Sequence, residues 1–413
     1  MKKEVLAIVV GGGPAPGING VISSAAIEAI NEGKKVVGII GGFKSLFAGD
    51  RKAVKQLSIE DVSRIHTTGG SILRTSRDPV EKAREKFTIL LATLNQLKAR
   101  YLLTIGGDGT AFMSRWIEQE TRGKLSVVHV PKTIDNDLYL PGDRSSFGYQ
   151  TARHWGVEIV KNLMEDAKTT GRWYFITTMG RNAGHLALGI GKAAGAPLTL
   201  IPEEFHNGTI SFQNITDILE GSMIKRLSMG KDHGVAILAE GISGKFDKRE
   251  LESLEDIQRD EVGRVRLSEI QLGRIFKNMV KKNLESRGIK TTIVHKTVGY
   301  ELRAADPIPY DIEYTRNLGY GAVRFLLCGG SGAMIVFDEG KLRPVSFVEL
   351  TDPLTGKIRH KLVDINSENY EVGRKYMIRL EKEDFTPRHT AALAKAANMS
   401  VAQFKKKFSY LAG

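Results

Sequence analysis

The sequence predicts an α/β protein with largely parallel sheets, and two patterns lead to this prediction. Short apolar runs of strand length recur along the 413 residues, and stretches with apolar residues at helical spacing separate them. Several runs end at glycine or at a polar segment, and ligands bind beyond the carboxyl ends of the strands in such sheets. We therefore expect helices on both faces of each sheet and functional residues at the strand ends.

The predicted elements follow one another from the N-terminus. Residues 5–10 form the first strand, a helix follows over residues 18–30, and Gly33 ends that helix as a C-cap glycine does. The charged stretch 244–266 is predicted to be a surface excursion between two lobes. Further strands are predicted at residues 35–40, 101–105, 125–130, 173–178, 234–238 and 291–298, and helices at residues 151–167, 212–226 and 267–287.

Composition narrows the class of protein. Cys328 is the only cysteine, which excludes an intrachain disulfide and a cysteine metal cluster and fits a reducing cytoplasm. No apolar stretch approaches the roughly 20 residues of a membrane-spanning helix, and the run at residues 5–10 is too short for a signal peptide. The formal charge of +13 is scattered, without a nucleic-acid-binding signature. We expect a cytoplasmic protein that binds neither membranes nor nucleic acids and attracts anionic small molecules.

Two glycine-rich segments at predicted strand ends suit phosphate binding. In residues 11–20, GGGPAPGING, glycines let backbone amides approach a phosphate, and the following helix offers its positive end. A plain turn is the alternative for this segment. In residues 106–110, GGDGT, the Asp108 carboxylate and the Thr110 hydroxyl suit magnesium on a polyphosphate. The alternative is an aspartate that caps a helix beginning near Thr110.

A third segment, PKTIDND at residues 131–137, directly follows the strand predicted at 125–130. Asp135 and Asp137 flank an amide, next to Lys132 and Thr133. Clustered acids near a base are costly unless they hold a metal, orient a nucleophile or cap a helix. A turn rich in Asp and Asn is the alternative, but the position at a strand end favours function.

Taken in order, these segments resemble the phosphofructokinase family. Its opening loop resembles residues 12–19, its GGDG motif matches residues 106–109, and its TIDND motif matches residues 133–137. The MGR of residues 179–181, a glutamate after a strand (Glu240) and GYELR at residues 299–303 extend the resemblance over most of the chain. GRNAGH at residues 180–185 is most similar to the longer bacterial subgroup, which includes ATP-dependent and pyrophosphate-dependent members.

The resemblance implies two Rossmann-like lobes with largely parallel sheets and an active site in the cleft between them. We predict a phosphoryl-donor and metal lobe at residues 1–146 and a sugar-phosphate lobe at residues 147–301. Residues 302–413 would complete both lobes and add C-terminal helices.

The resemblance also implies a kinase of glycolysis that phosphorylates the 1-hydroxyl of fructose 6-phosphate to give fructose 1,6-bisphosphate. Asp135 would be the general base, and Thr133 and Asp137 would position the hydroxyl and the nearby metal. Arg77 and Arg181 would offset charge on the transferring phosphoryl group. The cofactor would be Mg²⁺, held by Asp108. The donor would contact Gly13, Arg77, Gly107, Asp108, Gly109, Thr110 and Lys132.

For the sugar phosphate, the family's pattern implies contacts from both lobes and from a neighbouring subunit. Arg303 and Tyr300 would bind the 6-phosphate, although Tyr300 stands where many members carry histidine. Arg172 would reach across from the adjoining subunit, which implies a homodimer or homotetramer. An isolated arginine is otherwise usually a solvated surface group. The sugar itself would contact Thr133, Asp135, Met179, Gly180, Arg181 and Glu240.

The identity of the donor depends on opposing residues. Gly109 favours ATP, because an aspartate at the fourth position of GGDG would intrude on the space and charge of the α-phosphate. Lys132 favours pyrophosphate, since a lysine before TIDND is typical of pyrophosphate users. Met113 and its neighbour Phe112 would either line an adenine slot or fill it. We expect ATP as the donor, with a pyrophosphate-dependent phosphotransferase as the alternative.

Two other classes of function are less consistent with the sequence. GGDGT also resembles the phosphate motif of NAD and lipid kinases, but those families do not explain the TIDND and MGR segments. A basic binding protein without catalytic activity would require Asp108, Asp135 and Asp137 to be incidental, although they are predicted to lie at strand ends.

Overall fold

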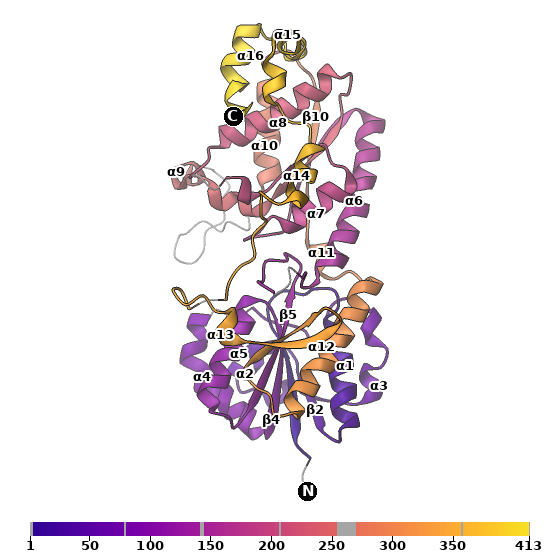
Figure 1. Ribbon diagram of the computed structural model, residues 1–413, viewed down its shortest axis with the longest axis vertical. Coiled ribbons are helices and arrows are strands. Elements are labelled where there is room, and N and C mark those ends of the chain that lie inside the picture. The colour runs from indigo at the N-terminus through magenta and orange to yellow at the C-terminus, as the bar shows by residue number, and fades with distance from the viewer. Residues whose placement is uncertain are drawn as a thin grey trace. The chain divides into compact units, whose positions relative to one another are not determined.

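The structure is a computed structural model that describes residues 3–77, 80–140, 144–205, 208–253, 270–356 and 358–412, with only the backbone of residues 80–85. The chain divides into two compact units (Figure 1). Unit 1 comprises Met1–Ala152 and Tyr300–Lys361, and unit 2 comprises Arg153–Gly299 and Leu362–Gly413. The sequence places lobe borders after residues 146 and 301, whereas the chain passes between the units at residues 152–153, 299–300 and 361–362.

Unit 1 contains an eight-stranded sheet in the order β12-β11-β5-β4-β1-β2-β3, with β6 paired to β5 beside this path. Only β3 and β12 run antiparallel to their neighbours, and both lie at edges of the sheet. The strands are β1 (Val5–Val10), β2 (Lys35–Ile39), β3 (Val54–Leu57), β4 (Ala99–Gly106), β5 (Ser126–Thr133), β6 (Phe147–Gly148), β11 (Ala333–Asp338) and β12 (Lys341–Ser346).

Both faces of the unit 1 sheet are covered by helices, as the continuous apolar run of β1 predicts. Leu6, Ile8 and Val10 belong to the core that includes α1 and α12, whereas Val9 and its alternate neighbours on β1 belong to the core with α2, α4 and α5. Figure 1 shows α1 and α12 on the side of the sheet opposite to α4 and α5. The helices are α1 (Ile18–Asn31), α2 (Gly42–Phe47), α3 (Ile59–Val62), α4 (Val80–Gln96), α5 (Asp108–Thr121), α11 (Tyr300–Arg303), α12 (Pro309–Leu327) and α13 (Phe347–Leu350).

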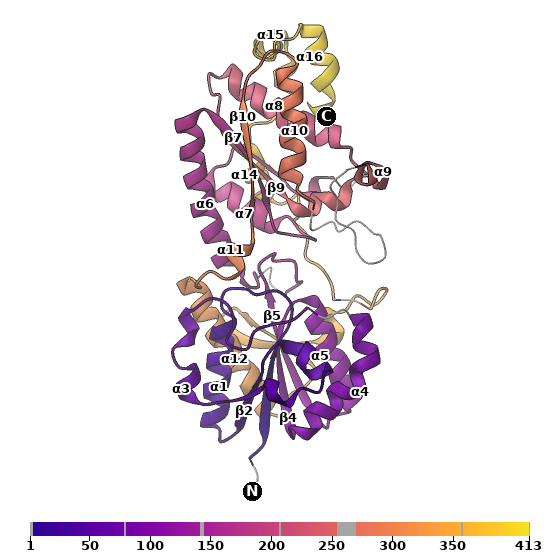
Figure 2. The ribbon, with the colours of Figure 1, turned by 180° about the vertical axis from the view of Figure 1, so that it is seen from behind.

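Unit 2 contains a fully parallel four-stranded sheet in the order β10-β7-β9-β8. Trp173 and Phe175 of β7 pack in a core with α8, α10, α15 and α16, and α7 packs against β8 and β9. Figure 2 shows α10 and α8 over the strands of this sheet. The strands are β7 (Arg172–Thr178), β8 (Leu198–Leu200), β9 (Gly234–Ala239) and β10 (Thr292–Val298). The helices are α6 (Tyr149–Thr170), which begins in unit 1, α7 (His185–Ala194), α8 (Phe212–Ser228), α9 (Lys248–Glu252), α10 (Leu272–Glu285), α14 (Glu368–Lys375), α15 (Pro387–Ala396) and α16 (Val401–Phe408).

The predicted fold class is confirmed, since both units are α/β with largely parallel sheets. The strand predicted at residues 125–130 is longer than expected and continues to Thr133. Residues 267–269 of the helix predicted at 267–287, and residues 254–266 of the predicted surface excursion, lie outside the described residues. Among the helices of the described ranges, none has the length and apolar character needed to cross a bilayer.

Candidate active site

The glycine-rich and acidic segments of unit 1 lie at one edge of its sheet. β1, β4 and β5 are parallel neighbours, so the residues that follow each strand are at the same edge. The chain continues from β1 to β2 on one side, whereas β4 pairs with β1 on the other side. The strand order therefore reverses between β1 and β4, which is where ligands bind in open α/β sheets. Gly13, Gly107, Asp108, Gly109, Thr110, Lys132, Thr133, Asp135 and Asp137 are all in these segments.

Thr110 packs against two strand ends at once. A methyl group in place of a glycine hydrogen would lie 2.4 Å from Thr110 Oγ1 at Gly11 and 2.2 Å from it at Gly106. Either distance is far shorter than van der Waals contact, so both positions require glycine. The first turn of α5 can approach the ends of β1 and β4 only because these two residues have no side chain.

The sequence suggested that Lys132 follows a strand that ends at residue 130. In the structure Lys132 lies inside that strand, because β5 continues to Thr133. Its side chain is buried, and its Nζ donates a hydrogen bond to the Gly13 carbonyl oxygen. Burial is the main reason that the pKa of Lys132 falls to about 8, and the positive charge of Arg77 lowers it further. A lysine held in this way presents a positive charge to the Gly12–Gly13 turn at neutral pH.

Two arginines approach the same turn from other parts of unit 1. A methyl group at Gly13 would lie 2.9 Å from Arg303 Nη1 and 3.0 Å from Arg77 Nη2. The Arg303 guanidinium also stacks over the Tyr300 ring, 4.7 Å from its centroid. We call Arg77, Lys132 and Arg303 the cation cluster. Three positive charges at one glycine turn form an electrostatic site for a small, highly charged anion.

The two acids of the TIDND segment have different surroundings. Asp137 is buried, and its Oδ1 accepts a hydrogen bond from Thr133 Oγ1 at 2.9 Å. Thr133 Oγ1 also accepts a hydrogen bond from the Asp135 backbone N–H at 3.0 Å. Unlike Asp137, Asp135 is only half-buried. Asp137 therefore holds the turn together through Thr133. Asp135 is the carboxylate that remains accessible to a reacting group.

Residue 146 stabilises this turn, although the sequence analysis does not identify it. Ser146 Oγ donates to the Thr133 carbonyl oxygen at 2.8 Å, and its backbone N–H donates to Asn136 Oδ1 at 3.1 Å. Asn136 has a φ of 55°, in the left-handed region that asparagine tolerates better than most residues. No sequence pattern marks Ser146, because it follows the turn by ten residues and meets it only through the fold.

A buried polar chain beneath the GGDG turn also escapes the sequence analysis. His129 Nε2 lies 3.1 Å from the Gly106 carbonyl oxygen, and its Nδ1 lies 2.9 Å from Thr104 Oγ1. Burial lowers the pKa of His129 to about 3, so the ring is neutral at pH 7. A carbonyl oxygen only accepts, so Nε2 carries the proton and Nδ1 accepts from Thr104. Ser114 Oγ continues the chain, 2.6 Å from Thr104 Oγ1 and 2.7 Å from the Thr110 carbonyl oxygen.

Asp108 begins α5 with an exposed carboxylate. Its Oδ1 accepts the Gly109 backbone N–H at 2.8 Å, and a methyl group at Gly109 would meet no other atom within 4 Å. Within the described residues there is no group of three histidines, cysteines or acids that could hold a metal. Magnesium is commonly held by one or two carboxylates together with the phosphates of a substrate, so a single accessible aspartate fits this ion.

In unit 2, three of the predicted sugar-binding segments follow neighbouring strands. Met179 and Gly180 come directly after β7, Glu240 comes directly after β9, and Gly299 comes directly after β10. Gly180 has a φ of 134°, and its carbonyl oxygen accepts the Gly241 N–H at 3.1 Å. The structure thus brings Met179, Gly180, Arg181 and Glu240 to the carboxyl edge of the unit 2 sheet.

Arg172 does not join that group, because it is the first residue of β7. A strand rises about 3.3 Å per residue, so the length of β7 separates Arg172 from Met179 by roughly 20 Å. Arg172 instead lies near Asp166, with 3.8 Å between its Nε and the Asp166 Oδ2. Within its own unit, Arg172 is therefore at the opposite edge of the sheet from the other predicted sugar-binding residues.

The chain matches known proteins over almost its entire length. The Phosphofructokinase family profile matches residues 5–326. A pyrophosphate–fructose 6-phosphate 1-phosphotransferase from Thermotoga maritima is 52% identical over 411 residues, which cover 98% of this chain and 98% of that protein. A protein of the same name from Naegleria fowleri is 47% identical over 416 residues, which cover 98% of this chain and 95% of that protein.

The fold is similar to solved structures as well. The T-state structure of phosphofructokinase from Pichia pastoris superposes with a TM-score of 0.67 at 22% identity. The match covers 99% of this chain, which spans only 39% of the length of the Pichia chain. At this level of identity the likeness concerns the fold alone.

These relatives overturn the expectation that ATP is the donor. Both of the relatives named above, at 52% and 47% identity, carry a name that specifies pyrophosphate. The open space at Gly109 is compatible with either donor and so does not decide between them. Met113 does not line an open slot, because its side chain is buried in the apolar core of α5 and the sheet. An open space at Gly109 is therefore no indication that ATP is the donor.

Proposed function

Because the chain belongs to the phosphofructokinase family, we propose that it transfers a phosphoryl group from pyrophosphate to the 1-hydroxyl of fructose 6-phosphate. The products are fructose 1,6-bisphosphate and orthophosphate. The cation cluster at the Gly12–Gly13 turn is the observation that carries this proposal. The names of the two full-length relatives support the same donor.

Pyrophosphate suits the cation cluster because of its size and charge. It has no nucleoside that could bind in an apolar slot, so charge and hydrogen bonds must supply its binding energy. Lys132 and Arg77 provide cationic hydrogen-bond donors to pyrophosphate at one turn, and charge-assisted hydrogen bonds are about twice as strong as neutral ones. The buried position of Lys132 strengthens its interaction with an anion, because less water screens the charge.

Phosphoryl transfer in this site relies on positioning and on charge. We assign Asp135 as the general base that accepts the proton of the 1-hydroxyl, because it is the accessible acid of the TIDND segment. Asp137 keeps Thr133 in place through their hydrogen bond. Lys132 and Arg77 would offset the charge on the transferring group, and Arg181 of unit 2 has the same proposed role.

Asp108 would hold Mg²⁺ together with oxygens of the donor. When bound, the ion would offset part of the negative charge of pyrophosphate and so make the donor easier to attack. The backbone would approach the phosphoryl donor closely at four residues: Gly13, Gly107, Gly109 and Thr110.

The sugar-phosphate contacts remain as the sequence predicts them. Met179, Gly180, Arg181 and Glu240 would meet the sugar from the carboxyl edge of the unit 2 sheet. Arg303 and Tyr300, which lie on α11, would bind the 6-phosphate. Arg172 lies at the far end of β7, which is consistent with a contact in the active site of a neighbouring subunit. Such a contact would require a homodimer or homotetramer. A cytoplasmic location stays a prediction.

Initial rates with fructose 6-phosphate and Mg²⁺ test this function when pyrophosphate and ATP are compared side by side. We expect kcat/KM for pyrophosphate to exceed that for ATP clearly. Lys132→Gly should reduce the pyrophosphate rate more than any ATP rate, because the positive charge is lost at the Gly12–Gly13 turn. Preferred use of ATP by the unmodified protein would refute the proposed donor. Absence of phosphorylation with both donors would refute the proposed reaction.

A further inference from the structure

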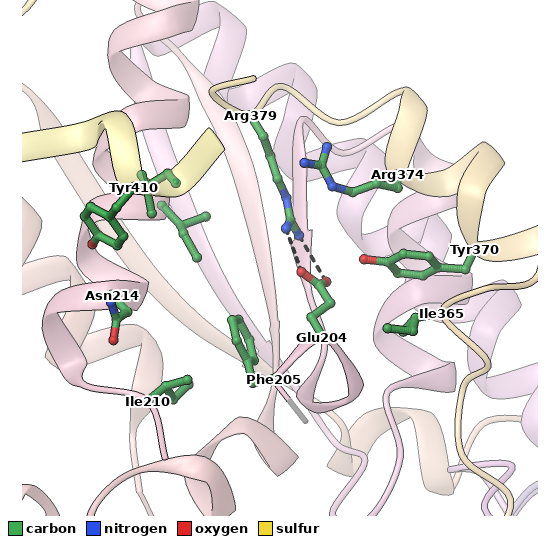
Figure 3. A pocket seen from close by; sticks show the side chains of 11 residues that line it. Glu204, Phe205, Ile210, Asn214, Ile365, Tyr370, Arg374, Arg379 and Tyr410 are labelled. Atoms are coloured by element: carbon green, nitrogen blue, oxygen red, sulfur yellow. Dashed lines mark hydrogen bonds and ion pairs between the residues drawn. The ribbon is translucent and has the colours of Figure 1, made fainter. Parts of the chain in front are cut away.

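Unit 2 contains a pocket that none of the proposed substrate-binding residues lines. Its volume is about 510 Å³, which is within the range of small-molecule sites. The turn after β8, helix α8, helix α14 and the C-terminal residues form its walls (Figure 3). Phe205, Ile210, Ile218 and Leu411 give it an apolar surface. We call it the Arg374 pocket.

A second wall of the Arg374 pocket is charged. Arg379 binds Glu204 through two hydrogen bonds of 2.6 and 3.0 Å, and donates a third to the Thr199 carbonyl oxygen at 2.7 Å. These bonds use three of the five N–H groups of the guanidinium. Arg374 is 28% exposed and forms an ion pair of 2.7 Å with Glu381, which is outside the lining. Figure 3 shows the Arg374 guanidinium turned toward Arg379.

Among the described residues of the lining, Glu204 is the only acid and two are arginines, so these residues carry one more positive than negative charge. An anion in the pocket would compete with Glu381 for Arg374, and with Glu204 for Arg379. The apolar wall would at the same time accept a body without charge. A ligand that combines both features matches the pocket better than either a bare anion or a neutral molecule does.

The turn Pro202–Glu204 connects this pocket to the loops proposed to bind the sugar. Glu203 accepts hydrogen bonds from the backbone N–H groups of Gly184 at 2.9 Å and Val363 at 3.0 Å. Gly184 immediately precedes α7 and follows the Met179–Arg181 segment by three residues. A methyl group at Gly241, next to Glu240, would lie 3.2 Å from Pro202 Cγ. Any movement of Glu204 therefore acts on a turn that contacts both loops.

We propose that the Arg374 pocket binds a small organic anion, a phosphate or carboxylate on an apolar body, and that its occupancy changes the affinity for the sugar phosphate. The anionic group binds Arg374 and Arg379, and the apolar body lies against Phe205 and its neighbours. Release of Glu204 from Arg379 alters the position of the Pro202–Glu204 turn. The Gly184 and Gly241 loops then respond through their contacts with that turn.

Calorimetric titration of the full chain tests the binding without turnover. Phenyl phosphate is the probe, and benzoate carries a carboxylate in place of its phosphate. Two further compounds are controls: inorganic phosphate lacks the apolar body, and benzyl alcohol lacks the anionic group. Methylenediphosphonate with Mg²⁺ fills the donor site throughout, so that the probes do not report on the cation cluster. We expect phenyl phosphate or benzoate to bind at one site per chain, and the two incomplete probes to bind at least about tenfold more weakly.

Variants decide whether the probe is in the pocket. Arg374→Ala should weaken the probe by at least about tenfold, the effect of losing one charge-assisted hydrogen bond. Arg388→Ala removes an equal charge from an exposed position of α15 outside the lining, and should change nothing. Glu381→Gln removes the competing carboxylate and should tighten binding. Equal affinities in the unmodified chain and in Arg374→Ala would overturn the site.

The coupling between the Arg374 pocket and the sugar-phosphate site is tested by a separate measurement. Fructose 6-phosphate should change the Kd of the probe by at least about fivefold, and the probe should change the Kd of fructose 6-phosphate by the same factor. Independent affinities would overturn the coupling. Both measurements are made without a phosphoryl donor that reacts. A protein that proves to use ATP would therefore contradict the proposed function while leaving the pocket standing.

Discussion

Asp135 and Asp137 show how two identical side chains in one short turn come to have different tasks. Asp137 is buried and accepts a hydrogen bond from Thr133, whereas Asp135 is half-buried. An asparagine at position 137 keeps an oxygen that can accept the Thr133 hydroxyl. An asparagine at position 135 keeps the size of the side chain but loses the ability to accept a proton.

We therefore expect Asp135→Asn to reduce kcat by at least about 10²-fold, the lower range for loss of a general base. The KM for fructose 6-phosphate should change much less, because the proton is transferred only in the transition state. Asp137→Asn is the matched control and should retain much more of the activity. Steady-state kinetics of both folded variants measures the difference. Equal losses in the two variants would mean that Asp135 is not the base.

The lowered pKa of Lys132 predicts a pH dependence. Below its pKa of about 8 the side chain is charged, and above this value it is neutral in the free protein. Since kcat/KM reports groups of the free enzyme, kcat/KM for pyrophosphate should fall roughly tenfold between pH 7 and pH 9. In Lys132→Arg the charge persists over this range, so whatever activity remains should lack this decrease. The same profile in both proteins would assign the decrease to another group.

Among the elements of unit 1, the ends of β4 and β5 and the first turn of α5 are joined by the hydrogen-bonded chain His129–Thr104–Ser114. This chain contacts the backbone of Gly106 and Thr110 on both sides of Asp108. Thr104→Val keeps the shape of the side chain but leaves His129 Nδ1 without its donor. The GGDG turn then loses part of its support from the strands beneath it.

We expect Thr104→Val to lower the free energy of unfolding by about 1–3 kcal/mol, the cost of an unsatisfied buried polar group. It should also raise the KM for pyrophosphate without changing that for fructose 6-phosphate, and Thr104→Ser should restore both values. Thr216→Val is the control, because Thr216 is also fully buried and donates to the Phe212 carbonyl oxygen in unit 2. It should lose stability alone. If Thr104→Val also lowers stability without changing the KM for pyrophosphate, the hydrogen bonds of Thr104 have only a structural role.

The proposed role of Arg172 in a neighbouring subunit predicts that one active site uses residues of two chains. Arg172→Ala and Asp135→Asn should each weaken the activity of their own homo-oligomers. In hybrid oligomers, Asp135 of one chain and Arg172 of another can form an intact site. Mixing the two variants, with dissociation and reassociation, should therefore restore activity. Sedimentation of the same samples reports whether hybrids form. Hybrids without activity would place Arg172 outside the active site of the neighbour.

Local patterns in the sequence were sufficient to predict the fold class and the central strands of both units. The apolar runs at residues 5–10 and 101–105 became the buried strands β1 and β4, because strands buried on both faces leave a continuous apolar signal. The motifs around Asp108 and Asp135 are short and local, so they can be read without knowing which residues will meet them. Edge elements such as β3 and β12, which lack that signal, were not predicted.

Which of these residues lie together depends on the packing between elements, which local patterns do not contain. Lys132, Arg77 and Arg303 are far apart in the chain, and the cation cluster exists because three segments meet at one glycine turn. In the sequence, Gly109 and Lys132 are separate signals that indicate different donors. The expectation of ATP, based on Gly109, was wrong. The His129 chain, Ser146 and the Arg374 pocket were likewise invisible, since each consists of contacts between elements. Local patterns determine elements, whereas burial and charge at a site depend on every segment that packs around it.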